Sequence, residues 1–167
     1  MRWSELDSDL TLWTLPRERA KNDVAHYVPI APQVRTVLAA LPRFAGSDFV
    51  LTTTGATSIS GYSKAKTALD AAVAVLNEGE PIPPWRIHDL RRAMASGMAR
   101  LGVQLPVVEK VLNHISGSFG GVAGIYQRHE FRAEKRQALE IWAKHLTTIV
   151  DGAPAATNVV EIAKARA

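Results

Sequence analysis

His88 and Arg91 lie three residues apart in the segment RIHDLRRAMASGMARLG (Arg86–Gly102). On a helix this spacing places both side chains on one face. Histidine can donate or accept a proton near neutral pH, and the planar fork of arginine matches two oxygens of a phosphate. The pair could therefore hold a phosphate and stabilise charge that develops on it. A second H-x-x-R at His129–Arg132 shows that the spacing is weak by itself, and a solvated helix face is its commoner meaning.

Three further side chains have chemical potential and an ordinary alternative. The hydroxyl of Tyr126 can be a nucleophile, but its free pKa of about 10 requires nearby cations or a base. The ordinary alternative is a half-buried tyrosine with its hydroxyl at the surface. Lys21 lies near the tip of an expected hairpin, where a lysine is usually solvated. His114 follows an expected helix, where a histidine often complements the helix dipole.

Other chemistries find little support in the sequence. The segment HEFRAE lacks the second histidine of an H-E-x-x-H zinc motif, and the chain has no cysteine, so we expect no metal site. No glycine-rich phosphate loop of the Walker or dinucleotide type is present. Nucleotide hydrolysis and hydride transfer therefore have no motif to carry them.

The composition suits one soluble domain with a concentrated basic region, which solubility alone could also explain. The 167 residues are 47% hydrophobic, enough for a core, and carry a net charge of +4. The positive charge is concentrated between Trp85 and Arg136, where nine Lys and Arg face four Asp and Glu. Such a region suggests a phosphate-rich partner. The lack of cysteine, of a signal peptide and of a membrane-length apolar run predicts a cytoplasmic protein without membrane contact.

The expected elements are one β-hairpin followed by helices. Alternating, β-branched and aromatic residues predict strands over Thr11–Pro16 and Ala25–Ile30, joined by a charged turn. The fold class is therefore mainly α with a small antiparallel β-hairpin near the N-terminus (α+β). Helices are expected in the segments 31–42, 60–77, 86–102, 105–114, 122–129 and 132–150.

Two local details of these helices can be predicted. In the segment 60–77, Ser60 is a candidate N-cap and Asn77 marks the end. In the segment 86–102, apolar residues recur at helical spacing and should fix the helix to the core: Ile87, Leu90, Met94, Met98 and Leu101.

The order of the candidate residues is more specific than any one of them. A lysine on an early hairpin is followed by HDLRR at a helix start, then by VLNH at a helix end, then by IYQRH. This order resembles the catalytic domain of the tyrosine recombinases, the phage integrase family, from roughly Trp3 to Leu146. The segment SGYSKAKTALD is also similar to a family helix that lies against DNA. The resemblance implies DNA contacts by Arg92, Lys64, Lys66 and Arg128.

The resemblance also implies a role for each candidate. Tyr126 would attack a DNA phosphodiester and leave a 3′-phosphotyrosine and a free 5′-hydroxyl. Arg91 would hold the non-bridging oxygens, and His114 would hydrogen-bond the phosphate. Lys21 would protonate the departing 5′ oxygen, and His88 would act in proton transfer. The family needs no cofactor, acts on double-stranded DNA and usually works as a tetramer.

The chain departs from the family pattern at its N-terminus. The first catalytic arginine of the family lies upstream of the hairpin, and the segment MRWSELD looks like the part just after it. We therefore expect residues 1–150 to be a catalytic domain lacking its N-terminal part, with impaired activity alone. Residues 151–167 would be a tail that could dock in cis or in trans. The alternatives are a non-enzymatic DNA-binding or regulatory remnant and, less favoured, a type IB topoisomerase.

Overall fold

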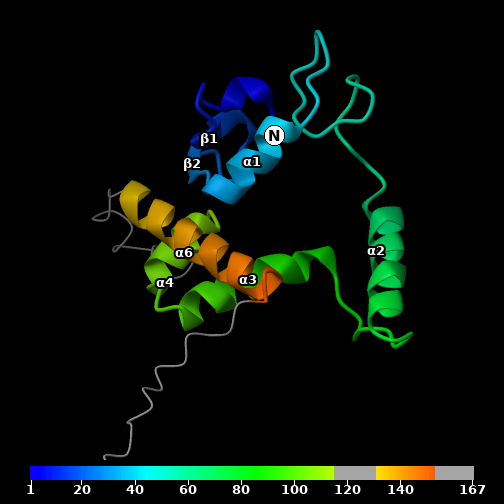
Figure 1. Cartoon of the computed structure of the whole chain (residues 1–167). Helices are drawn as coiled ribbons and strands as arrows, with labels where there is room; N and C mark the ends of the chain where they lie inside the picture. Colours follow the sequence, from blue (N-terminus) through cyan, green and yellow to red (C-terminus); the bar gives the residue numbers. More distant parts are fainter. Residues whose placement is uncertain (115–130, 153–167) are drawn as a thin grey trace, which may run out of the picture.

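The computed structural model describes residues 1–114 and 131–152, and the remainder of the expected tail from residue 153 lies outside that range. Helices dominate, and one antiparallel hairpin lies near the N-terminus (Figure 1), so the predicted fold class is confirmed. None of the helices in this part of the chain is long and apolar enough to cross a lipid bilayer. The elements in chain order are η1 (Trp3–Glu5), β1 (Leu12–Leu15), η2 (Arg17–Arg19), β2 (His26–Pro29), α1 (Pro32–Ala40), α2 (Tyr62–Leu76), α3 (Ile87–Arg100), α4 (Leu105–Val111) and α6 (Arg132–Val150).

The hairpin forms where the sequence predicts it, with β1 and β2 each shorter than predicted by one residue at each end. β1 and β2 pair antiparallel, and Leu15 stands opposite His26 at the end nearest the connection. The connection contains the 3-10 turn η2, and Lys21 lies exposed in the turn that follows it. The expected position of Lys21 near the hairpin tip is therefore confirmed.

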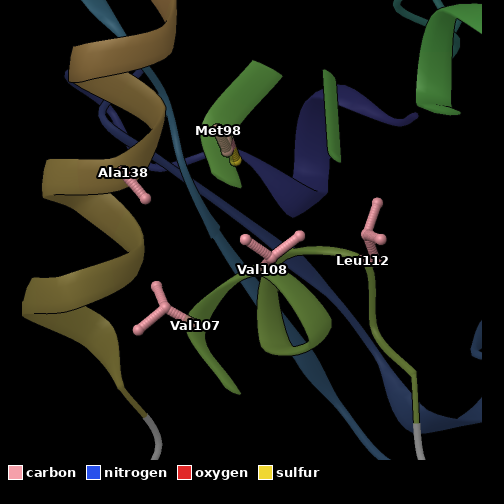
Figure 2. Close-up of a cluster of buried hydrophobic side chains, with 5 residues drawn as sticks. All are labelled: Met98, Val107, Val108, Leu112 and Ala138. Atoms are coloured by element: carbon pink, nitrogen blue, oxygen red, sulfur yellow. The ribbon is translucent and has the colours of Figure 1, made fainter. Parts of the chain in front are cut away.

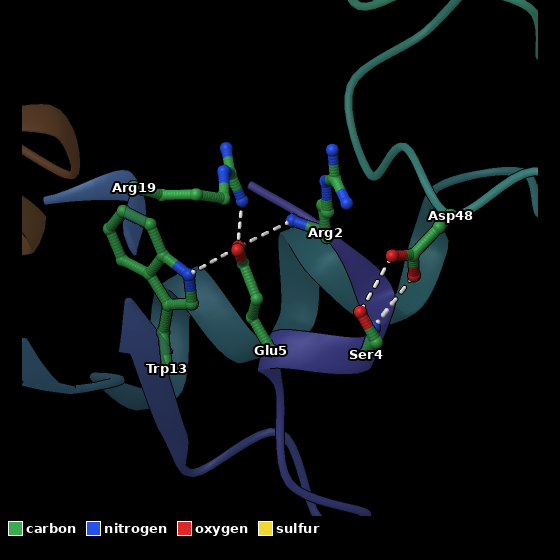
Figure 3. A network of polar contacts seen from close by, with 6 residues as sticks. All are labelled: Arg2, Ser4, Glu5, Trp13, Arg19 and Asp48. Carbon is green, nitrogen blue, oxygen red and sulfur yellow. Dashed lines mark hydrogen bonds and ion pairs between the residues drawn. The ribbon is translucent and has the colours of Figure 1, made fainter. Parts of the chain in front are cut away.

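A buried carboxylate ties the N-terminal turn to the hairpin. Glu5 accepts hydrogen bonds from the indole Nε1 of Trp13 at 3.0 Å and from the backbone N–H of Arg2 at 2.9 Å, and it also pairs with Arg19 (Figure 3). A buried charge is tolerated only when it is paired and hydrogen-bonded. The Glu5 network meets both conditions and fixes the connection between β1 and β2 to the strand it leaves.

The main core lies where α3, α4 and α6 meet. Its buried side chains are Met98, Val107, Val108, Leu112 and Ala138 (Figure 2). Met98 has no exposed surface, and Trp142 of α6 packs against this cluster. Burial of apolar side chains is the main stabilising term in folding, so this cluster fixes the three helices to one another.

The expected apolar face of α3 is only partly buried, and this prediction is wrong for half of the helix. Met94 and Met98 pack in the core, but Ile87 and Leu90 are 44% and 59% exposed, and Leu101 is 37% exposed. Periodicity identifies one side of a helix, but burial requires another element on that side. In the part of the chain that the structure describes, α4 and α6 cover the second half of α3 only.

Helix α2 stands apart from the other helices (Figure 1). None of its residues is buried, and Leu69, Val75 and Leu76 are at least half exposed. The expected N-cap Ser60 is also wrong. Gly61 occupies the N-cap with a left-handed φ of +80°, and no side chain caps this end of the helix. Asn77 is the C-cap, as expected.

Candidate functional site

The start of α3 exposes His88 in the first turn. Asp89 accepts a hydrogen bond from the backbone N–H of Arg86 at 2.8 Å, and this bond fixes the entry to the helix. Trp85, just before it, donates from Nε1 to Asp70 of α2 at 2.9 Å. The exposed His88 therefore sits on a helix end that is anchored on both sides, with its imidazole open to solvent.

Arg91 reaches across to the end of α4. Its Nη2 donates to the backbone carbonyl of Leu112, a buried residue, while Arg91 as a whole residue is exposed. A cation at a helix C-terminus is favourable because the last carbonyls carry partial negative charge. The bond fixes part of the guanidinium and leaves other N–H groups of its five available to an anion.

The chain leaves α4 through a tight left-handed turn. Asn113 has φ of +56°, a conformation that asparagine adopts more readily than most residues. The N–H of Asn113 donates to Lys110 at 3.3 Å, and the N–H of His114 donates to Glu109 at 3.0 Å. This is the Schellman arrangement, and it presents an exposed His114 directly after the turn.

Two carbonyls at the end of α4 are then taken by side chains from other elements. The Leu112 carbonyl accepts from Arg91 of α3, and the backbone of Val111 is hydrogen-bonded by His26 of β2. The last four carbonyls of a helix have no partner within it. At α4 all four are satisfied, two by the turn itself and two by His26 and Arg91.

His26 is held neutral at physiological pH. Burial lowers its pKa from 6.5 to about 4, with Lys135 and then Arg91 adding repulsion, and the hydrogen bond to Val111 opposes the shift. Lys135 is itself buried, and its Nζ donates to the carbonyl of Tyr27 at 2.7 Å. A neutral imidazole with one N–H bonded to a carbonyl has a fixed tautomer.

The hairpin connection touches the same turn. Asn22, next to Lys21, donates from Nδ2 to Oδ1 of Asn113 at 3.0 Å, although 91 positions separate them. The backbone on either side of these two residues carries Lys21 and His114. The structure therefore brings together the segments that hold Lys21, Arg91 and His114, around the last residues of α4.

The residues expected to bind DNA are in different situations. Lys64 is exposed on α2. Lys66 instead pairs with Asp70 at 2.5 Å and lies 4.6 Å from the ring centroid of Trp85. The Lys66 hydrogen bond is the largest cause that lowers the pKa of Asp70. Within the described residues, Arg92 makes a long 3.4 Å contact with Asp89, and its side chain is largely exposed.

Two predicted site residues, Tyr126 and Arg128, lie outside the described residues. Within the described ranges, no group of three His, Cys, Asp or Glu side chains is placed to hold a metal ion. His26 and Asn22 were not among the predicted site residues. His26 was hidden in an ordinary alternating strand, and Asn22 resembled a turn former. Only the proximity of α4, which is distant in sequence, reveals their contacts.

The amino-acid sequence is similar to sequences of known proteins. The sequence profile of the phage integrase family matches residues 1–132, about four fifths of the chain. A relative from Escherichia coli (strain K12), named IntB, is 24% identical over 158 residues. The match covers 87% of this chain and 39% of IntB, so the chain spans well under half of that relative's length. No solved structure gives a significant match. With the profile covering the hairpin, α3 and α4, the chain belongs to the phage integrase family.

Proposed function

We propose that this chain contributes the reaction centre for site-specific DNA recombination, by strand cleavage and rejoining through a 3′-phosphotyrosine. The observation that supports this proposal best is the set of contacts around the last residues of α4. There Arg91 bonds Leu112, Asn22 beside Lys21 bonds Asn113, and His114 follows at once. Three cationic or protonatable side chains thus project from backbone that is locked together, as phosphoryl transfer requires.

The proposed reaction balances without an external energy source. The Tyr126 hydroxyl loses its proton and forms a bond to phosphorus, while the bond from phosphorus to the 5′ oxygen breaks. Lys21 gives a proton to that oxygen, so a free 5′-hydroxyl leaves. The phosphodiester is conserved as a phosphotyrosine, and a second 5′-hydroxyl can attack it to rejoin the strand.

Side chains of α3 and of the segment after α4 would stabilise the negative charge that develops on the phosphate. The free N–H groups of Arg91 would bind the non-bridging oxygens as negative charge grows on them. His114 would donate a hydrogen bond to the same phosphate. His88, exposed one turn before Arg91, would move the proton of the tyrosine or of its phosphate environment.

The DNA duplex would lie across the basic side of the site. Arg92 and Lys64 are exposed cations on α3 and α2, and the region from Trp85 to Arg136 carries most of the excess positive charge. Arg128 and Lys66 complete the proposed set of phosphate contacts. Recombination exchanges strands between two duplexes, so the proposal includes a homo-oligomer, a tetramer, assembled on DNA.

A nicked suicide duplex tests the reaction. Cleavage close to the nick releases a short fragment that diffuses away, so the protein–DNA adduct accumulates. Because the recognition sequence is not defined, a pool of duplexes with randomised sequence around the nick is used, and adducts are recovered by denaturing gel. We expect DNA binding that weakens as salt rises and a slow adduct that Tyr126→Phe abolishes.

The same experiment separates the second candidate, a DNA-binding or regulatory protein without catalysis. Salt-dependent binding without any Tyr126-dependent adduct would support this candidate and overturn the enzymatic proposal. Absence of DNA binding at low salt would overturn both.

A further inference from the structure

Three consecutive residues at the end of α4 are each held by a side chain from another element. His26 of β2 bonds the backbone of Val111, and Arg91 of α3 bonds the carbonyl of Leu112. Asn22 of the hairpin connection bonds the side chain of Asn113. We refer to the three contacts as the α4 clasp.

We propose that His26 and Asn22 are positioning residues that act through the α4 clasp to hold Arg91 and His114 in their working orientation. This inference rests on the proposed function and extends it to residues that would not touch DNA. The hairpin, which carries Lys21, would thereby be linked to the helix end that precedes His114.

Two backbone carbonyls at the end of α4 depend on donors from other elements. The turn at Asn113 uses up the carbonyls of Glu109 and Lys110, so those of Val111 and Leu112 must find donors elsewhere. A buried carbonyl without a donor is costly, and Leu112 is only 7% exposed. His26 and Arg91 supply the donors, so the cap of α4 is complete only when both are in place.

The bonds of His26 and Arg91 depend on each other because their partners are neighbours in the chain. They bond neighbouring residues, so a shift of the peptide at Val111 displaces the carbonyl that Arg91 holds. Losing the His26 bond would let the last turn of α4 fray, and the guanidinium of Arg91 would lose a fixed partner. Small displacements of this kind cost large factors in phosphoryl transfer, where the rate depends on positioning.

Asn22 adds a connection that the backbone cannot provide. Its bond to Asn113 runs from the turn that holds Lys21 to the residue before His114, at 3.0 Å. Nothing else that the described residues show between these two turns joins their side chains in this way. The distance between Lys21 and His114 would then be set by one side-chain pair.

Conservative variants separate positioning from simple stability. His26→Phe keeps a ring but removes the N–H, while His26→Gln keeps a donor that can reach a carbonyl. Asn113→Gly retains the left-handed turn, which suits glycine, and removes only the acceptor for Asn22. Asp23→Asn is the matched control, because Asp23 is next to Asn22 but pairs with Arg17 at 2.9 Å, and asparagine tolerates the left-handed φ of +54° at this position.

The first readout needs no DNA. The guanidinium N–H signals of Arg91, assigned with Arg91→Lys, are followed by NMR in the free chain. We expect slowly rotating, resolved signals in the wild type, His26→Gln, Asp23→Asn and Asn113→Gly, because the Leu112 carbonyl stays in place in all four, and averaged signals in His26→Phe. Unchanged Arg91 signals in His26→Phe would overturn the proposal.

The second readout is the single-turnover rate of the Tyr126 adduct, measured beside the thermal midpoint of each variant. We expect His26→Phe and Asn113→Gly to slow adduct formation by roughly ten- to a hundredfold. His26→Gln should recover most of the rate, and the thermal midpoint of Asn113→Gly should not fall. If His26→Phe and Asn113→Gly both form the adduct at the wild-type rate, the proposal that His26 and Asn22 are positioning residues is also overturned. If the Arg91 signals become averaged in His26→Phe while even the wild type forms no adduct, the inference about the α4 clasp is supported and the proposed function is overturned.

Discussion

The indole of Trp142 in α6 lies directly over Gly97 of α3, so close that a methyl group at position 97 would overlap the ring. The contact sits beside Met98, the most deeply buried core residue of α3. The second half of α3 is therefore the part that packs against α4 and α6. Its first half, with His88 and Arg91, extends beyond the main core and relies on Asp70 and Leu112 for its orientation.

Gly97→Ala tests how tightly this interface is packed. Alanine is the better helix former by about 1 kcal/mol, but overpacking a tight contact costs about 1–3 kcal/mol. We expect the clash to dominate and to lower the free energy of unfolding measured by urea titration. Ser96→Ala, on the exposed neighbouring position, should be neutral or slightly stabilising. A Gly97→Ala variant more stable than the wild type would show that the indole moves aside.

His26 should make stability depend on pH in a defined window. Its pKa is 6.5 when unfolded and about 4 when folded, so below pH 6.5 the unfolded chain binds a proton that the folded chain does not. This stabilising contribution is complete above pH 6.5 and is lost as the pH falls toward 4. Urea titrations at intervals between pH 7 and pH 4 should show a smaller decline for His26→Gln than for the wild type. Identical pH slopes for the two proteins would contradict a neutral, buried His26.

Much of the fold follows from local sequence, and the exceptions have particular causes. Alternation predicted the hairpin and periodicity predicted α3, because these signals depend on residues close in the chain. The exposure of Ile87 and Leu90 was not predictable, since periodicity does not reveal whether a partner covers the face. His26 and Asn22 were missed for the same reason. Their partners lie on α4, and only the folded chain places them together.

Lys64 and Lys66 should differ in their contribution to DNA affinity, although both were predicted to bind DNA. Lys64 is exposed, whereas the charge of Lys66 is already offset by Asp70 at 2.5 Å. Each phosphate contact adds about 0.9 to the slope of log affinity against log salt. Lys64→Ala should therefore reduce this slope by about 0.9 in fluorescence anisotropy titrations, and Lys66→Ala should reduce it by less. Equal reductions would mean that Lys66 leaves Asp70 when DNA binds.

Lys21 can be tested as the acid by changing the leaving group. An alkoxide needs a proton to depart, whereas a thiolate, with a thiol pKa of about 8.5, leaves without one. We expect Lys21→Ala to slow adduct formation on ordinary suicide duplexes by about 10²–10⁴-fold. On duplexes with sulfur in place of the bridging 5′ oxygen, the variant should approach the wild-type rate. Arg91→Ala should stay slow on both substrates, because the Arg91 side chain would stabilise the phosphate rather than the leaving group. Equal impairment of Lys21→Ala on oxygen and sulfur substrates would assign Lys21 to phosphate binding and remove it from proton transfer.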